Sequence, residues 1–566
     1  MQRIKGRLVD IFQEKWYPAE ILIEDGKISS VTPLPDAGNG HAPDESTLAA
    51  GDLPFILPGF IDAHVHIESS LLIPAEFARL AVVHGTVATV SDPHEIANVC
   101  GLAGVEFMIR NGRTVPFKFN FGAPSCVPAT RFETAGARLD APDVEALLKK
   151  PEIKYLAEMM NFPGVLNKDP EVMAKIAAAH ALNKPVDGHA PGLRGQVAGE
   201  YIAAGISTDH ECFTAEEALD KLRFGMKILI REGSAAKNFD ALIGLLNDYP
   251  DQMMFCSDDK HPDSLVAGHI DQLCSRAVAK GVDVFNVLKA ACLNPVIHYK
   301  LDCGLLRAGD PADMILVDDL KTFKVLRTYI DGELVAENGV SKIASTPVEG
   351  IVNRFHCEPK APEDFAFLLN KWGEEENVEQ VYVIGAQDGQ LITNKLTVPV
   401  KDTRPENGRL QSNPGKDILK IVVVNRYLAA PVAKSFIRNF GLKRGALASS
   451  VAHDSHNIVA VGVDDESLCK AINLVIREKG GISCADPGQG DGETEMVLPL
   501  PVGGLMSASD GYSVAGAYMA IDAMAKNLGS ALSAPFMTLS FMALLVIPHL
   551  KLGDLGLFDG DKFELV

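Results

Sequence analysis

Residues 55–66 read FILPGFIDAHVH, an apolar run that ends in two histidines separated by one valine. The run is short and bounded by turn-forming residues, which is typical of a buried strand. Alternate side chains of a strand point to one face, so the imidazoles of His64 and His66 leave that face close together. Two neutral imidazoles that converge on one point favour a divalent metal site. A lone His-x-His pair is also typical of surface histidines at a strand end, so the rest of the chain must decide.

Beyond this run, apolar strands alternate with helical stretches, such as 170–183 and 215–224, up to about residue 300. Eight strand–helix units predict an α/β fold, a (β/α)8 TIM-like barrel over 56–299. A doubly wound α/β sheet is the alternative, but no glycine-rich nucleotide fingerprint follows the first strand. Besides 55–66, strands are predicted at 85–92, 117–123, 154–160, 184–189, 205–210, 226–231 and 252–258.

Short β-strands flank the barrel on both sides. The Asp-Gly pairs at 25–26 and 331–332 are typical of tight hairpin turns between such strands. Neither flank is large enough to bury a core alone. We therefore predict a composite small β-sandwich from residues 1–55 and 300–345, with the barrel inserted between the two pieces.

A third region follows a proline-containing linker. Residues 350–566 have their own alternation of apolar strands and helical runs, which predicts a separate C-terminal α/β domain. The expected strands are 380–385, 418–425 and 458–463, and the expected helices are 465–479 and 511–527.

The composition narrows the classes of protein. The chain has 566 residues, 47% of them hydrophobic and 22% charged, as in a soluble globular enzyme. A net charge of −21 argues against nucleic acid and against an anionic membrane as partners. Ten cysteines without a Cys-x-x-Cys pair suit free thiols in a reducing compartment. With no signal-like start and no span-length apolar run, we expect a cytoplasmic location.

Metal-ligating side chains recur where the predicted barrel strands end. Because parallel strands place their carboxyl ends at one rim, these side chains would face a common mouth. Each has an ordinary alternative, such as a Glu158–Lys154 ion pair or a helix cap at Asp258. The recurrence at the ends of strands 1, 4, 5, 6 and 8 favours the metal site. The candidate ligands are His64, His66, Glu158, His189, His210 and Asp258.

The mixture of imidazole and carboxylate indicates the kind of metal centre. Two ions need a bridging anion to offset their repulsion, and Glu158 could supply it. This donor set, with no thiolate evident, suits Mn or Fe, with Zn as the alternative. A water held between two such ions loses its proton near neutral pH, and Asp258 could accept that proton and pass it to a leaving group.

The order of these motifs resembles the amidohydrolase superfamily. A closer similarity is to the bacterial adenine deaminase family, in which glutamate stands where many relatives have a carboxylated lysine. The similarity spans nearly the whole chain. The strings that carry it are SDPHEIANV at 91–99, AEMMNFPGV at 157–165, DGHAPG at 187–192, TDHE at 208–211, SDDK at 257–260 and AHDSHN at 452–457.

The resemblance implies hydrolytic deamination of adenine to hypoxanthine and ammonia, in purine salvage, with two Mn or Fe ions on the six candidate ligands. The ring must gain a proton as the amine leaves, and Glu95 and His94 are the candidates for that acid. Their ordinary alternative is loop hydrogen bonding or a helix N-terminus. Asp258 is the third catalytic candidate. There are two alternatives. One is another amidohydrolase that acts on a cyclic amide or a different aminated base, and the other is a metal-free scaffold. We also expect a homo-oligomer.

Two further segments invite functional interpretation. Residues 231–234 could line the same pocket, but a solvated loop is the favoured reading. Residues 453–456, with two histidines around Asp-Ser, are expected to form a structural turn or a loop that approaches the barrel mouth. An independent catalytic triad is disfavoured because triad members usually come from distant segments.

Overall fold

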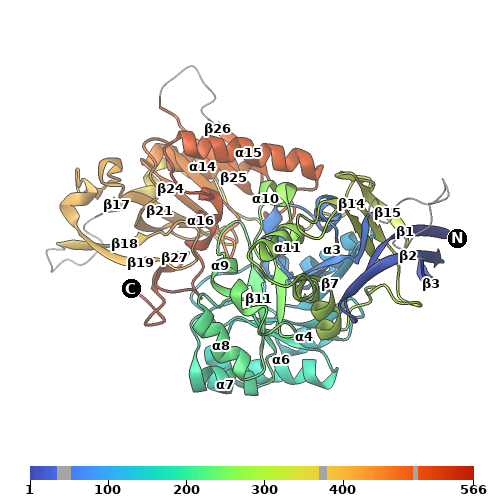
Figure 1. Cartoon of the computed structure of the whole chain (residues 1–566). Helices are drawn as coiled ribbons and strands as arrows, with labels where there is room; N and C mark the ends of the chain where they lie inside the picture. The colour runs from blue at the N-terminus through green and yellow to red at the C-terminus, as the bar shows by residue number, and fades with distance from the viewer. Residues whose placement is uncertain (35–52, 369–378, 489–494) are drawn as a thin grey trace.

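The computed structural model describes residues 1–34, 53–368, 379–488 and 495–566, and three eight-stranded sheets organise them. Figure 1 shows a central barrel, a sheet with the N-terminal strands on one side of it, and the C-terminal region on the other. The chain runs from the flanking sheet into the barrel, returns to the flanking sheet and then enters the C-terminal region. The predicted α/β class is confirmed.

The barrel consists of eight parallel strands in sequence order. It closes through a parallel bridge between Val65, at the end of β5, and Asp258, just after β12. The predicted (β/α)8 architecture is therefore confirmed, and the strand ends share one rim. The strands are β5 Phe60–Val65, β6 Thr86–Ser91, β7 Lys118–Ala123, β8 Ile153–Met159, β9 Val186–Gly188, β10 Thr208–Asp209, β11 Lys227–Arg231 and β12 Met253–Cys256.

Helices surround the barrel (Figure 1). Several of them begin at capping residues. Asp140 forms a reciprocal capping box with Asp143, and Thr214 accepts from the N–H of Glu217 at 3.2 Å. Each such cap stabilises its helix by about 1 kcal/mol. The helices are α1 Pro74–Ala81, α2 His94–Cys100, α3 Leu102–Gly112, α4 Ala141–Leu148, α5 Phe162–Leu166, α6 Pro170–Ala181, α7 Gly195–Ala203, α8 Ala215–Arg223, α9 Phe239–Leu242, α10 Pro262–Ala267, α11 Ile270–Ala279, α12 Val284–Leu288 and α13 Asn294–Tyr299.

The predicted single strand at 55–66 is wrong in one respect, because the chain breaks it at Gly59. β4 (Phe55–Pro58) pairs within the flanking sheet, whereas β5 begins the barrel. A Cβ atom at Gly59 would lie 2.3 Å from a methyl carbon of Val87 in β6. Glycine is required there because the backbone passes this side chain too closely for any other residue.

The flanking sheet joins both ends of the barrel segment. Its order is β16-β15-β14-β13-β4-β1-β2-β3, and both halves contribute to one buried cluster. The predicted turns are present, with positive φ at Asp25, Gly26, Asp331 and Gly332. Residues 35–52 of the predicted 1–55 piece lie outside the described residues. The strands are β1 Gln2–Asp10, β2 Lys15–Glu24, β3 Lys27–Pro33, β13 Met314–Val317, β14 Val325–Ile330, β15 Glu333–Glu337 and β16 Val340–Ser341.

The C-terminal region contains a mixed sheet in the order β19-β18-β22-β21-β24-β23-β25-β26. Its helices are α14 Asp465–Arg477, α15 Gly511–Asn527 and α16 Pro535–Phe541. That this region is a separate domain stays a prediction, as do the domain boundaries. Its strands are β17 Phe367–Leu368, β18 Gln380–Gly385, β19 Asn394–Pro399, β20 Arg409–Leu410, β21 Leu419–Val424, β22 Ala433–Arg438, β23 Ala446–Ser449, β24 Ile458–Gly462, β25 Gly481–Ala485, β26 Glu495–Pro499, β27 Leu550–Gly553, β28 Gly556–Asp559 and β29 Glu564–Leu565.

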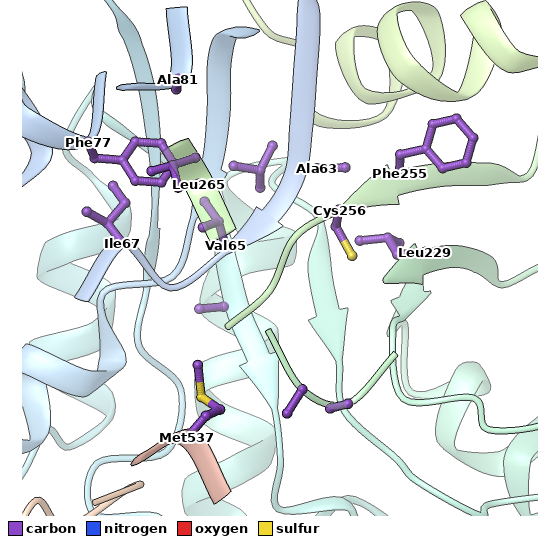
Figure 2. Close-up of a cluster of buried hydrophobic side chains, with 14 of the residues drawn as sticks. Ala63, Val65, Ile67, Phe77, Ala81, Leu229, Phe255, Cys256, Leu265 and Met537 are labelled. Carbon is purple, nitrogen blue, oxygen red and sulfur yellow. The ribbon is translucent and has the colours of Figure 1, made fainter. Parts of the chain in front are cut away.

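The barrel and the C-terminal region share one hydrophobic core. Figure 2 shows Met537 of α16 below Val65 of β5, and both belong to the cluster that also holds Phe255 of β12. Met537 is 1% exposed, and burying a side chain of this size stabilises the fold by about 1.5–3 kcal/mol. The C-terminal region is thereby packed against the end of the barrel that carries the candidate ligands. Within the described residues, no helix combines the length and the apolar character that a membrane span needs.

Candidate metal centre

The barrel rim gathers the six candidate ligands into one buried cluster. Each comes from the end of a different strand, except for the pair on β5. All six are at most 7% exposed. They are His64 and His66 on β5 and directly after it, Glu158 on β8, His189 after β9, His210 after β10 and Asp258 after β12.

The first group of ligand atoms surrounds the carboxylate of Asp258. The Nε2 atoms of His64 and His66 lie 3.2 Å apart, as expected for alternate residues of one strand. Asp258 Oδ1 is 3.6 Å from His64 Nε2 and 3.2 Å from His66 Nε2. Nitrogen and oxygen atoms at these separations can share one metal ion.

Glu158 connects this group to a second one. Its Oε1 is 3.4 Å from His66 Nε2. Its Oε2 is 2.8 Å from His189 Nδ1 and 3.2 Å from His210 Nε2. The two oxygens of one carboxylate thus face two different sets of imidazoles, which is the arrangement expected of a bridging ligand.

The carboxylates of the cluster are held in the form that binds a cation. Burial raises the pKa of Glu158, but His189 and His210 outweigh burial and hold this pKa well below its ordinary value. Burial likewise acts to raise the pKa of Asp258, but Arg231 and the histidines of β5 keep it well below the usual range. Both side chains are therefore ionised near neutral pH.

The pKa values of the imidazoles show that the cluster is strongly acidic. Burial lowers the pKa of His66, but Asp258 and other carboxylates outweigh it and raise this pKa well above its ordinary value. His210 behaves in the same way through Glu158 and Glu211. The acidic side chains thus stabilise positive charge at this point. Imidazole and carboxylate donors in overlapping groups fit divalent metal ions.

A second layer of side chains, behind the candidate ligands, fixes the strand ends that carry them. Asp62 accepts from the backbone N–H of Ser257 at 2.9 Å and lies 2.8 Å from His269 Nε2. The other imidazole nitrogen of His269 is 2.7 Å from Thr86 Oγ1. These bonds tie β5 to the end of β12 beside the ligands. Sequence reasoning missed this layer, although Asp62 lies in the same strand as His64 and its side chain would face the same side.

The structure places Arg231 differently from the sequence-based prediction. The favoured reading of residues 231–234 as a solvated loop is wrong for Arg231, which is 1% exposed. Its NH1 donates to Asp258 Oδ2 at 2.7 Å and also pairs with Glu211. Glu211 Oε1 in turn lies 3.3 Å from His210 Nε2. Arg231 and Glu211 are therefore part of the charged cluster, and the apolar strand before Arg231 carries it inward.

His94 and Glu95 lie at the mouth, at the start of α2. His94 Nδ1 lies 3.1 Å from Asp92 Oδ2 and 3.4 Å from Glu158 Oε1. The carboxylate of Glu95 contacts His453 and His456, which belong to the C-terminal region. The loop at 453–456 is therefore placed over the barrel mouth.

The cavity above the ligands is small, about 30 Å³, which is room for about one water. Leu391 and Leu544 add apolar lining to it from the C-terminal region, and a molecule larger than water needs more room than this cavity has. The charged and polar lining comes from both parts of the chain and includes His66, His94, Glu95, Glu158, His189, His210, Glu211, Arg231, Asp258, Asp259, His453 and Asp454.

Comparison with known proteins gives the family. Residues 55–335 match the model described as the amidohydrolase family, and residues 390–564 match that of the adenine deaminase C-terminal domain. A protein of Salinibacter ruber named adenine deaminase is 54% identical over 565 residues, covering 100% of this chain and 98% of its own length. One of Sulfurovum sp. with the same name is 54% identical over 564 residues, covering 100% and 99%. The chain belongs to the adenine deaminase family.

The adenine deaminase family match spans the barrel, the flanking sheet and the C-terminal region together. Among solved structures, an adenosine deaminase from Xanthomonas campestris with bound zinc has a TM-score of 0.44 at 16% identity, covering 60% of this chain and 94% of that chain. A β-aspartyl dipeptidase from Fervidobacterium islandicum has a TM-score of 0.45 at 17% identity, covering 60% and 99%.

Proposed function

We propose that this protein hydrolyses adenine to hypoxanthine and ammonia, as a step of purine salvage. The observation that carries the proposal is the convergence of His64, His66, Glu158, His189, His210 and Asp258 at one rim. Full-length similarity to proteins named adenine deaminase supports adenine as the substrate.

The residues of the cluster would hold two divalent ions, with Mn or Fe favoured and Zn as the alternative. His64, His66 and Asp258 would hold one, His189 and His210 the other, and Glu158 would bridge them. When bound, the ions supply Lewis acidity and lower the pKa of water. Arg231 and Glu211 would fix the orientation of Asp258 and His210 toward this centre.

Proton transfer falls to the side chains around the ligands. Asp258, whose Oδ1 faces the histidines, would accept a proton from the attacking water and pass it to the departing amine. Burial lowers the pKa of His94, but Asp92 and Glu95 outweigh this and hold it well above its ordinary value. His94 therefore carries a proton that it can donate to a ring nitrogen.

Glu95 has a different part in this proposal. Burial raises its pKa, but His453, His94 and His456 outweigh burial and hold the pKa well below its ordinary value. An ionised Glu95 is a poor acid. It would keep His94 charged and positioned, so the proton donor of the pair is His94.

The test is ammonia release from adenine by protein loaded with Mn, beside guanine and a cyclic imide. Turnover of adenine, lost with a chelator and restored by Mn, is expected. Turnover of another compound but not adenine would instead favour a different amidohydrolase. Native protein without metal and without turnover would favour a scaffold. That the chain is a cytoplasmic homo-oligomer stays a prediction, and light scattering would test its oligomeric state.

A further inference from the structure

The loop at 452–457, between β23 and β24, is held rigidly over the barrel mouth. Its own residues bond across it, because the N–H of Ala452 donates to His456 Nδ1 at 3.2 Å. The hydroxyl of Tyr427 donates to the carbonyl of Ser455 at 2.7 Å. Asn457 reaches the barrel segment, where its Nδ2 donates to the carbonyl of Thr134 at 2.9 Å. These bonds fix the loop without using every polar atom on it.

Two polar atoms of this loop remain unused, and both residues line the cavity above the candidate ligands. Asp454 is 3% exposed; its Oδ1 lies 3.3 Å from His94 Nε2, and its Oδ2 has no hydrogen-bond partner among the described residues. His453 is also 3% exposed, and its Nε2 has no such partner, with Asp259 Oδ1 3.9 Å away.

Buried polar atoms without partners are costly, about 1–3 kcal/mol each, and usually mark a place where a ligand or water completes the bonding. Here the acceptor and the imidazole nitrogen stand on neighbouring residues of one loop. Leu391 and Leu544, from the same region of the chain, add apolar surface to the cavity. An apolar wall with a few convergent polar groups suits a flat heteroaromatic ring.

We propose that Asp454 and His453 bind the N3–N9 edge of a free purine base, with Asp454 Oδ2 accepting the N–H at N9 and His453 Nε2 donating to N3. The inference rests on the proposed function and assigns the part of the substrate that does not react. Free adenine carries an N–H at N9 and an acceptor at N3 beside it, so this edge matches a carboxylate next to an imidazole donor.

The state of His453 supports its part as a donor. Burial lowers its pKa, but Glu95 outweighs burial and raises the pKa to about 9, so both ring nitrogens carry protons near neutral pH. The Nδ1 proton faces Glu95, which leaves the Nε2 proton for the ligand. A purine with a substituent on N9 lacks the N–H that Asp454 would accept, and it is bulkier at that edge. Recognition by Asp454 therefore selects the unsubstituted base.

The experiment compares binding of hypoxanthine and 9-methylhypoxanthine to Mn-loaded full-length protein by calorimetry. The variants are Asp454→Asn, which keeps the shape of the side chain, and Asp561→Asn as a control on an exposed carboxylate of the same region. We expect wild type and Asp561→Asn to prefer hypoxanthine. In Asp454→Asn this preference should fall at least tenfold, while Mn content and melting temperature stay unchanged.

The outcomes separate the inference from the proposed function. An unchanged preference in folded, metal-replete Asp454→Asn overturns the inference and leaves the function intact. Purine binding with the expected preference but no release of ammonia from adenine overturns the function and supports the assigned edge. No binding of either purine by wild type overturns the inference. With active enzyme, Asp454→Asn should raise KM for adenine at least tenfold and change kcat much less.

Discussion

The backbone N–H of Asp258 donates to the carbonyl oxygen of His64 at 2.9 Å. The N–H of His66 donates back to the carbonyl of Asp258 at 3.3 Å. These two bonds form the bridge that closes the barrel, so closure of the sheet and convergence of three candidate ligands are one structural event. A substitution that breaks these two hydrogen bonds should therefore lower both the metal affinity and the free energy of unfolding.

Substitution of Gly59 tests the start of the first barrel strand. Gly59→Ala would place a Cβ atom 2.3 Å from a methyl carbon of Val87, so it should destabilise the protein by about 1–3 kcal/mol and lower its metal content. Gly516→Ala is the matched control, since nothing lies within 4 Å of its added Cβ in α15. The control should be neutral or slightly stabilising in urea unfolding. Equal stability of the two variants would contradict the close approach.

Glu158→Gln tests the bridging ligand. It removes the negative charge between the two groups of imidazoles. Loss of a side chain that only supports a ligand lowers metal affinity by up to about 100-fold, so loss of a ligand itself should lower it further. Metal content after dialysis, measured by mass spectrometry, would show the loss. Glu145→Gln, on the exposed face of α4, should retain its metal. Full metal content in Glu158→Gln would exclude Glu158 as a ligand.

Arg231→Met tests the buried ion pairs. Without this guanidinium, Glu211 and Asp258 are left as buried carboxylates without their cation, which should cost about 3–5 kcal/mol of stability. Arg223→Met, with a side chain that is 67% exposed, should change stability by less than about 0.5 kcal/mol. Adding Glu211→Gln to Arg231→Met should recover part of the loss. A double variant less stable than the single one would refute the pairing.

Lys551 predicts a dependence of stability on pH. Burial lowers its pKa from 10.5 to about 7, while its Nζ donates to the carbonyls of Leu391 at 2.6 Å and Phe541 at 2.9 Å. Between these pKa values the unfolded chain binds a proton that the folded protein does not, so stability rises with pH, by at most about 1.4 kcal/mol per unit. Lys551→Met should lack this rise.

Urea unfolding at several pH values from 7 to 10 would measure the difference between wild type and Lys551→Met. Lys562→Met, at a side chain that is 64% exposed, should follow wild type. If the free energy of unfolding changes with pH in the same way for wild type and Lys551→Met, Lys551 does not titrate in this range. Leu391 lines the cavity and its carbonyl accepts from Lys551, so the same variant should also alter KM.

Much of the fold followed from local pattern. Short apolar runs between helical stretches predict the barrel strands within a few residues, and the Asp-Gly pairs predict two hairpin turns. The break at Gly59 could not be found in this way, because it depends on Val87, which packs there only after β6 is in place. Burial of Arg231 could not be predicted for a similar reason, since its carboxylate partners come from two other strand ends.

By itself, the sequence determined which side chains end the parallel strands, and parallel pairing then requires those ends to meet at one rim. The tertiary structure alone decided what covers that rim. Glu95 and His453 are 358 positions apart, and no local periodicity relates them. Their contact arises because the C-terminal region buries Met537 and its neighbours in the same core as the barrel. Burial of apolar surface, which has no signature in residue spacing, brings the loop at 452–457 to the mouth.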